Sequence, residues 1–262
     1  MYDLQKASMG KRISAFLFDI IMLFTVAVGL IWAIFAIAGY DGYAEAYDAE
    51  KAACISEYEE IYGIELDISK EDAAKLSAEE LELYNKAVEA ANEAFGKNET
   101  AAYNYSMMIN ILMLSVSLGA LISYLLLEFT IPLILKNGQT LGKKIFGVAV
   151  MYTSGIRINS VGMFVRTVLG KYTVETMVPA MIFLLIILGR IGIVGIAVLI
   201  LLAVFEIGLM IFNKTRPLIH DALAMTVCVD LGSQLIFEDA NEMIEYKKRI
   251  HAEAAEKAKY LD

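Results

Sequence analysis

Long apolar segments constrain this chain more than any other feature of its sequence. A helix that crosses the hydrocarbon core of a bilayer, about 30 Å thick, needs roughly 20 apolar residues. Residues 13–38 and 105–135 meet this requirement. A longer stretch, 173–212, is interrupted near Gly189 and predicts two further crossings joined by a tight turn, the first of them purely apolar only from Met177. We therefore expect an all-α membrane protein with a four-helix transmembrane bundle.

The acidic character of the chain is confined to one segment between the first two crossings. The formal net charge is −9, although 58% of the residues are hydrophobic and the mean hydropathy is +0.58. Residues 40–104 hold 17 of the 31 acidic residues but only five of the 22 lysines and arginines. The remainder of the chain is therefore slightly basic, and the net charge does not indicate a soluble acidic protein.

Basic residues orient the crossings, because loops on the cytoplasmic side of a membrane carry an excess of lysine and arginine. Such residues precede the first crossing, fill the loop between the second and third, and recur in the tail. We expect both termini in the cytoplasm and the acidic segment outside. The alternative is a signal peptide cleaved after Ala38, which is disfavoured because this apolar run has 26 residues and contains Asp19.

These boundaries divide the chain into four parts. Residues 1–135 contain the first two crossings and an extracytoplasmic insertion, 41–104; residues 136–172 form a cytoplasmic loop, 173–230 the last two crossings, and 231–262 a charged helical tail. The insertion is predicted to be a helical hairpin whose second helix opens with a capping box of Ser77 and Glu80. Its acidic surface could gather cations or a partner, although a solvated helical face is the commoner origin of such charge.

The cytoplasmic loop is predicted to contain a small β-structure. Residues 148–158 alternate around a Thr-Ser-Gly turn, which is typical of a short β-hairpin, and a strand near Cys228 is expected to join it. Asn159 or Ser160 then caps an amphipathic helix that ends near Lys171 and carries Arg166. Hairpin and helix would form a basic platform under the bundle.

Several short motifs resemble the RDD family of bacterial membrane proteins. Lys11-Arg12 and Asp19 look like the family's opening arginine and first aspartate, and residues 138–148 are similar to its central glycine-rich segment. An arginine follows in the next helix, and the segment 220–227 looks like the one that supplies the second aspartate. The residues that carry the resemblance are Arg12, Asp19, Gly142, Lys143, Arg166, His220 and Asp221.

The resemblance covers the first crossing and residues 105–230. It implies a multi-pass protein of the bacterial cytoplasmic membrane, and alkali-cation/proton antiport, which some members have been assigned; the domain also occurs in membrane complexes. This chain departs from the family pattern in its long acidic insertion, and in having four crossings where many members have three.

Three acidic residues are predicted to lie inside the crossings. Asp19, Glu128 and Glu206 each stand eight residues from a lysine on the cytoplasmic side, so at about 1.5 Å per residue each lies roughly 12 Å from that side. If their helix faces converge, they form a shared site of oxygen ligands suited to Na⁺ or a proton. Pro132 would free a backbone carbonyl near residue 128 as a further ligand.

The alternative for these carboxylates is separate pairing. Ionisable groups inside a membrane mark either a functional site or a paired structural one. Pairing with cationic side chains would make Asp19, Glu128 and Glu206 structural; the available partners are Arg12, Arg166, Arg216 and His220. Asp221, beside His220 at the membrane edge, is expected to be structural.

Two functions correspond to these two alternatives. The first is a small-ion transporter that exchanges Na⁺ or another monovalent cation for protons. Four helices are few for a transporter, so a homo-oligomer or a membrane-complex partner is expected. The second is a membrane scaffold or accessory subunit that docks partner proteins through its acidic hairpin and basic inner face.

Other classes of function lack a sequence signal. We expect no enzyme, no cofactor, no structural metal site and no nucleic-acid partner, because no catalytic triad order, phosphate-binding glycine motif or zinc-type spacing is present. Cys54 and Cys228 are predicted on opposite sides of the membrane, so no disulfide is expected.

Overall fold

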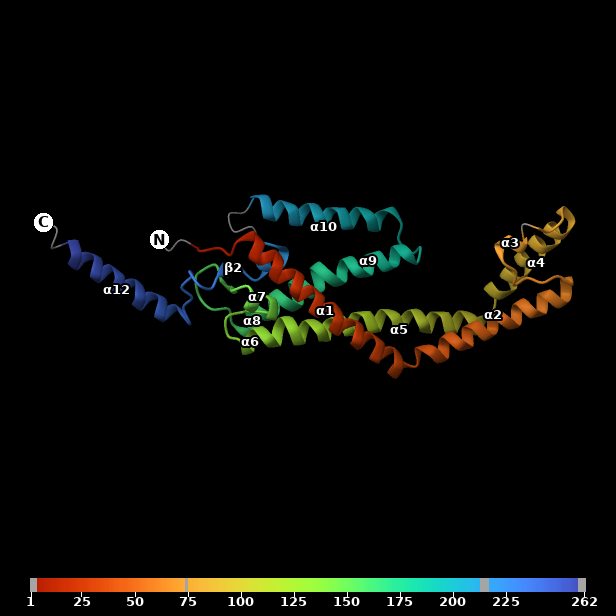
Figure 1. Cartoon of the computed structure of the whole chain (residues 1–262), viewed down its shortest axis with the longest axis horizontal. Coiled ribbons are helices and arrows are strands. Elements are labelled where there is room, and N and C mark those ends of the chain that lie inside the picture. Colours follow the sequence, from red (N-terminus) through yellow and green to blue (C-terminus); the bar gives the residue numbers. More distant parts are fainter. Residues whose placement is uncertain (1–3, 74, 213–216, 259–262) are drawn as a thin grey trace. The chain divides into compact units, whose positions relative to one another are not determined.

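The computed structural model describes residues 4–73, 75–212 and 217–258, which are mostly helical and form a single small sheet (Figure 1). The chain divides into two compact units, one made of residues 1–29 and 119–262 and the other of residues 30–118. Helices α1 (Met9–Ala38) and α5 (Glu99–Tyr124) contribute residues to both units.

Four helical runs within the described residues are long and apolar enough to cross a membrane. They cover Met9–Ala38, Glu99–Ile134, Ser160–Ile187 and Ile193–Phe212. Each of the four predicted crossings thus corresponds to a helical run that could span a membrane. The first three runs begin earlier than the apolar residues alone predict, because polar residues extend each helix at its amino-terminal end.

The third run unites two parts that the sequence predicts separately. It comprises α8 (Ser160–Phe164), the π-helical segment η2 (Val165–Met177) and α9 (Val178–Ile187). Its predicted cap is confirmed, since the Asn159 side chain accepts a hydrogen bond from the Gly162 N–H at 2.8 Å. The expected break after Lys171 is absent, so the amphipathic helix of the loop continues directly into the third crossing.

The second run also changes its helical geometry. After α5 come the π-helical segment η1 (Leu125–Thr130) and α6 (Ile131–Ile134). Each π-helical segment ends just before a proline, Pro132 in one case and Pro179 in the other. Proline lacks the amide N–H that would bond the carbonyl four residues earlier, and its ring crowds that carbonyl, so regular α-helix is interrupted here.

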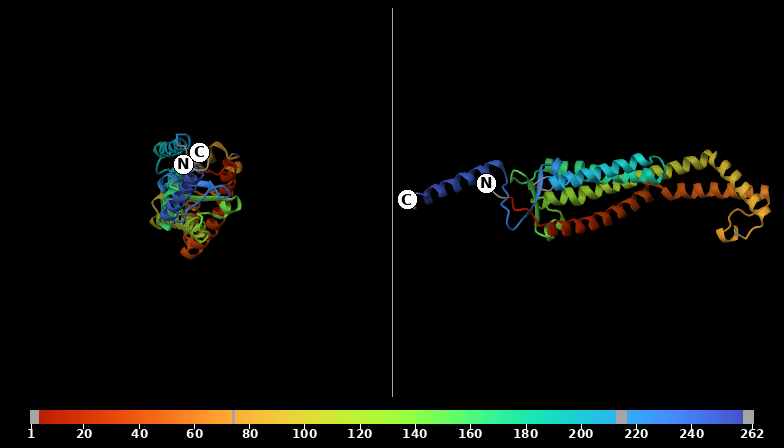
Figure 2. Two further views of the ribbon diagram at one scale, coloured as in Figure 1. Left: turned by 90° about the vertical axis from the view of Figure 1, so that its left-hand side faces the viewer. Right: turned by 90° about the horizontal axis from the view of Figure 1, so that it is seen from above.

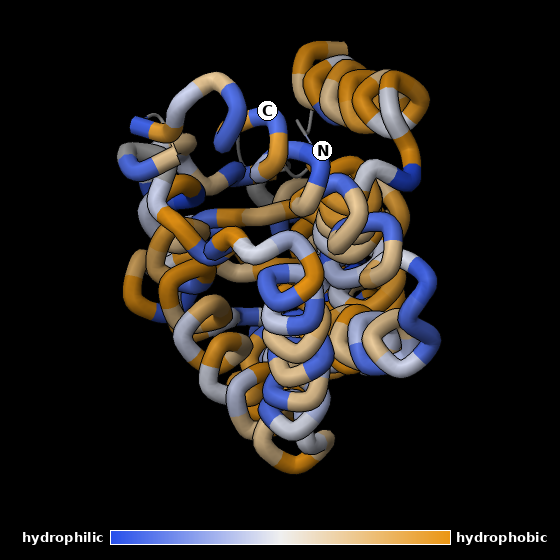
Figure 3. Tube along the Cα trace, turned by 90° about the vertical axis from the view of Figure 1, so that its right-hand side faces the viewer, coloured by the Kyte–Doolittle hydropathy of each residue, from blue (hydrophilic) through white to orange (hydrophobic). Residues whose placement is uncertain are grey.

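The fourth run, α10 (Ile193–Phe212), packs beside α9 after a turn at Gly189, whose φ of 66° favours glycine (Figure 2). It is hydrophobic along its length (Figure 3). In the most apolar part of α10, 6% of the residues are buried inside the protein, and in the most apolar part of α1 none are. Both helices therefore leave most of their apolar surface available to lipid.

The sheet pairs β1 (Val148–Tyr152) with β2 (Thr226–Asp230) in antiparallel register, Val150 opposite Cys228. The predicted strand near Cys228 is present and is the principal partner. The predicted hairpin arm is shorter than expected: the turn forms, but residues 156–158 contribute only isolated bridges, from Met151 to Arg157 and from Ile156 to Phe237. Both sheet faces are buried, one of them against Met163 and Ile158.

Two short helices and the tail helix complete this unit. The helices α7 (Leu141–Ile145) and α11 (Ile219–Leu223) each precede a strand, and α12 (Ala240–Ala258) is the predicted charged tail helix. Thr140 caps α7 by accepting the Lys143 N–H. These short helices place side chains against the ends of the long ones.

The second unit contains the predicted acidic hairpin. Helices α2 (Tyr40–Tyr62) and α4 (Ala78–Gly96) pack together, with the short α3 (Lys70–Ala73) between them in sequence. The capping box of Ser77 and Glu80 is confirmed. A small core holds the hairpin together, built on Leu66, Ala87 and Ala91.

Candidate functional site

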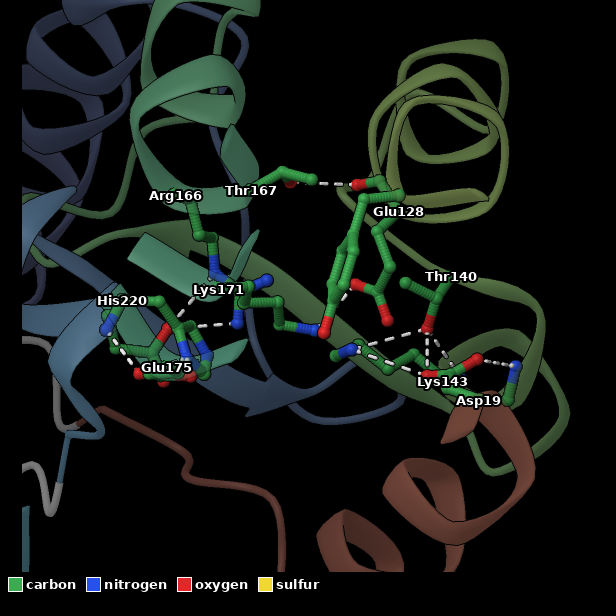
Figure 4. A network of polar contacts seen from close by, with 12 residues as sticks. Asp19, Glu128, Thr140, Lys143, Arg166, Thr167, Lys171, Glu175 and His220 are labelled. Atoms are coloured by element: carbon green, nitrogen blue, oxygen red, sulfur yellow. Dashed lines mark hydrogen bonds and ion pairs between the residues drawn. The ribbon is translucent and has the colours of Figure 1, made fainter. Parts of the chain in front are cut away.

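Buried charged side chains from five elements meet within the first unit. They come from α1, η1, α7, η2 and α11, and link through hydrogen bonds and ion pairs (Figure 4). We call this set the polar network. Its ionisable members are Asp19, Glu128, Lys143, Arg166, Lys171, Glu175, His220 and Asp221.

Asp19 is held by the start of α7. Its carboxylate accepts hydrogen bonds from the Thr140 hydroxyl and, at 2.7 Å, from the Gly142 N–H, and lies 3.5 Å from the Lys143 ammonium. A Cβ on Gly142 would stand 2.3 Å from the Ala15 carbonyl oxygen, so only glycine lets α7 approach α1 this closely. Gly142 thus allows α7 to supply hydrogen-bond donors to Asp19, which is only 7% exposed.

Lys143 connects Asp19 to the rest of the network. Its side chain is buried, also donates to the Thr140 hydroxyl at 3.2 Å, and interacts electrostatically with Glu128, Lys171 and Arg166. Burial, and then repulsion from Lys171, hold the pKa of Lys143 below its ordinary value against the attraction of the two carboxylates.

Glu128 is the second buried carboxylate. It lies 2.5 Å from the Lys171 ammonium, and its backbone carbonyl accepts a hydrogen bond from the Thr167 hydroxyl at 2.9 Å. This is the carbonyl that Pro132 was expected to free. It is taken up by Thr167, so it bridges η1 and η2.

Arg166 and Asp221 form the most buried ion pair of the described residues, at 1% and 2% exposure. Arg166 Nε and Nη2 lie 3.1 and 3.0 Å from the same carboxylate oxygen, which also accepts the Thr226 hydroxyl at 2.8 Å. Burial opposes ionisation of Asp221, but Arg166 and then His220 outweigh it and keep the pKa of Asp221 well below its usual range. The pair and the Thr226 hydrogen bond tie η2, α11 and β2 together.

His220 lies between two carboxylates. Its backbone N–H donates to Glu175 at 2.7 Å, and its Nδ1 lies 2.7 Å from the other Glu175 oxygen. Its Nε2 is 3.6 Å from Asp221. Burial, the largest influence, and repulsion from Arg166 keep the pKa of His220 below its usual value despite Asp221. A neutral imidazole with a proton on Nδ1 satisfies Glu175.

Glu206 does not join these contacts. It is half-buried on α10, and among the described residues no hydrogen bond or ion pair links it to Asp19 or Glu128. Its carboxyl lies within electrostatic range of Glu175. Of the three carboxylates expected to share a site, two therefore enter the polar network and the third stands apart from them.

The remaining expected partners fall elsewhere. Arg12 lies half-buried in the first turn of α1, about 10.5 Å along the helix from Asp19 at 1.5 Å per residue. Arg216 lies outside the described residues. The carboxylates pair instead with lysines: Lys143, a motif residue, and Lys171.

Sequence reasoning overlooked Lys171 and Glu175 as members of the site. Both were assigned to the end of the loop helix and the start of the third crossing, where polar residues need no buried partner. The missed signal is their spacing: four residues apart, they share a helix face if the helix continues.

Comparison with known protein families places the whole polar network within one family match. A model of the RDD family matches residues 6–225. This match covers every ionisable member of the polar network and most of the chain. No curated protein and no solved structure matches the chain.

Proposed function

We propose a transport function for this chain, which belongs to the RDD family and has four helices able to cross a membrane. The protein would exchange a small monovalent cation for protons at the polar network. In this proposal both termini and the sheet face the cytoplasm, and the acidic hairpin lies outside, as the distribution of lysine and arginine favours.

A charge imbalance in the polar network carries the proposal. Among the described residues, four of its members are carboxylates, Asp19, Glu128, Glu175 and Asp221. Three are cations, Lys143, Lys171 and Arg166. Lys143 and Lys171 pair with Asp19 and Glu128, and Arg166 pairs with Asp221. Among the described residues, Glu175 therefore has no lysine or arginine partner of its own: it hydrogen-bonds His220, whose lowered pKa favours the neutral imidazole, and Lys171 acts on it only through electrostatic attraction.

An uncompensated charge in a low-dielectric site is costly. The excess negative charge leaves room for one further positive charge, which can be a monovalent cation among the carboxylates or, below the ordinary pKa of His220, a proton on that residue. Alternation between the two is the minimum chemistry of a cation/proton exchanger. A cation near Asp19 or Glu128 would have to displace a lysine ammonium, because Lys143 and Lys171 already pair with these carboxylates.

Purified protein in liposomes tests this proposal. An imposed Na⁺ or K⁺ gradient should drive proton movement in the opposite direction, followed with an internal pH indicator. Glu175→Gln removes the excess negative charge and should abolish the coupled proton flux while the protein remains folded. Glu93→Gln, on the exposed surface of the acidic hairpin, is the matched control and should behave as wild type. Equal activity of empty and protein-containing liposomes would refute transport and favour a scaffold.

The proposed orientation has its own test. Ser154→Cys and Glu89→Cys, placed separately at exposed positions of a cysteine-free variant, can be labelled in intact cells with an impermeant thiol reagent. The proposal predicts labelling at position 89 and none at position 154. Labelling at position 154 and none at position 89 would show that the topology is the inverse of the one proposed.

A further inference from the structure

Two neighbouring helices repeat one short pattern at the polar network. Each network glutamate of the second and third crossings is followed four residues later by a proline: Glu128 by Pro132 and Glu175 by Pro179. A tyrosine precedes each glutamate by about one turn, and the rings of Tyr124 and Tyr172 meet at 6.0 Å. The three prolines of the chain thus include two at equivalent positions.

The local backbone differs from α-helix at both places. Both glutamates lie within π-helical segments, η1 and η2, which end directly before the proline turn. The Ile131 N–H bonds the Leu126 carbonyl and the Val178 N–H bonds the Thr173 carbonyl, in each case five residues back rather than four. A π-helical turn carries an extra residue, so it rotates the side chains before it relative to those after it.

The two π-helical segments also contact one another. The Tyr124 hydroxyl lies 2.8 Å from the Thr176 hydroxyl, and the Glu128 carboxylate pairs with Lys171 across the contact. The Glu128 carbonyl, which would accept an N–H from residue 132 in an α-helix, instead accepts the Thr167 hydroxyl. The hydrogen bond that the proline removes within one helix is thus replaced by one between helices.

We propose that Pro132 and Pro179 are a matched pair of positioning residues for the exchange site. By denying the α-helical hydrogen bond at Glu128 and Glu175, they keep both helices in the π-helical register that aims each glutamate at its partner, Lys171 or His220. The inference rests on the proposed function for its consequence in transport, but its structural part stands without it.

A double-mutant cycle tests the structural part. Thr167→Val leaves the Glu128 carbonyl without a donor and should lower the thermal midpoint in detergent. Pro132→Ala supplies an N–H for the same carbonyl, so Thr167→Val should have little further effect in that background. If Thr167→Val lowers the midpoint equally in both backgrounds, the proline does not control this carbonyl and the inference is overturned.

A second double-mutant cycle tests whether Pro132 directs the Glu128 side chain toward Lys171, and it does not depend on the first cycle. Lys171→Met should lower the thermal midpoint of the wild type, because it strands Glu128, and should lower it much less after Pro132→Ala, because that glutamate has turned away. Equal losses in both backgrounds would overturn the inference.

Measurements of proton flux then distinguish a failure of this inference from a failure of the proposed function. In liposomes, Pro132→Ala and Pro179→Ala should each reduce the maximal rate of cation-driven proton flux at least tenfold while the protein remains folded. Ile131→Ala and Val178→Ala alter the same turns without restoring an amide and should retain wild-type rates. Wild-type rates in both proline variants would overturn the inference while leaving transport intact. Absence of flux in the wild type would refute the proposed function, leaving the two stability cycles to decide the inference.

Discussion

The two units of this chain handle charge in opposite ways. The acidic hairpin carries its charges on exposed surfaces around a core of alanine, leucine and tyrosine, and its ion pairs are exposed, such as Lys97 with Glu93. The first unit buries charged side chains against one another at the ends of its long helices. Water stabilises each hairpin charge separately, whereas each buried charge depends on a particular partner. The same substitution chemistry should therefore have very different consequences in the two units.

The largest effect is expected at Arg166. Arg166→Met leaves Asp221 buried and unpaired, and loss of one partner of a buried ion pair costs about 3–5 kcal/mol. We expect the variant to unfold at least partly in detergent, as measured by thermal unfolding. Asp221→Asn added to Arg166→Met should recover part of the stability. Wild-type stability of the single variant would show that the pair is not a structural tie.

The next largest effect is expected in mild acid, which should destabilise the first unit but not the acidic hairpin. Both shifted groups of α11 have lowered pKa values, so the folded unit binds fewer protons than the unfolded chain. Stability is lost as pH falls below the ordinary His value of 6.5, and again below the ordinary Asp value of 3.8. Between pH 7.5 and 5.5, hydrogen exchange of the intact protein should accelerate in β2 and α11 but not in the hairpin. Equal acceleration in α4 would remove the distinction.

The cap of α4 should have a moderate and local effect. Ser77→Ala removes the side-chain acceptor for the Glu80 N–H and should cost about 1 kcal/mol, the usual value for such caps. Exchange should accelerate in α4 alone. Loss of stability in η2 or α11 would show that the two units fold as one.

The smallest effect is expected at an exposed pair. Lys97→Ala breaks the contact with Glu93, which is worth about 0.3–0.5 kcal/mol at this spacing. No measurable change in thermal midpoint is expected. A loss comparable to that of Arg166→Met would contradict the contrast between solvated and buried charge.

The sequence predicted the elements better than the contacts. Four crossings, the hairpin with its capping box and the strand near Cys228 follow from apolar length, local capping and alternation, which are properties of neighbouring residues. The partners of the carboxylates depend on helix rotation, and spacing from a lysine gives only depth. Glu206 illustrates this limit: it shares the predicted depth of Asp19 and Glu128, but among the described residues no hydrogen bond or ion pair links it to either.

Two further features were hidden for physical reasons. Lys171 and Glu175 interrupt an apolar run, which favours a helix end, yet buried partners satisfy them and the helix continues. Each π-helical segment ends just before a proline and contacts a neighbouring helix, and no local propensity predicts contacts between helices.

Cation-driven proton flux through Asp19→Asn protein tests the central claim most directly, because the asparagine keeps the shape of the site and removes its charge. The account predicts that wild-type protein in liposomes exchanges Na⁺ or K⁺ for protons, and that Asp19→Asn protein that remains folded does not, even if the loss of a partner for Lys143 lowers its thermal midpoint. Unchanged flux in folded Asp19→Asn protein, or a loss of stability with no flux in the wild type, would contradict it and leave the polar network a structural device.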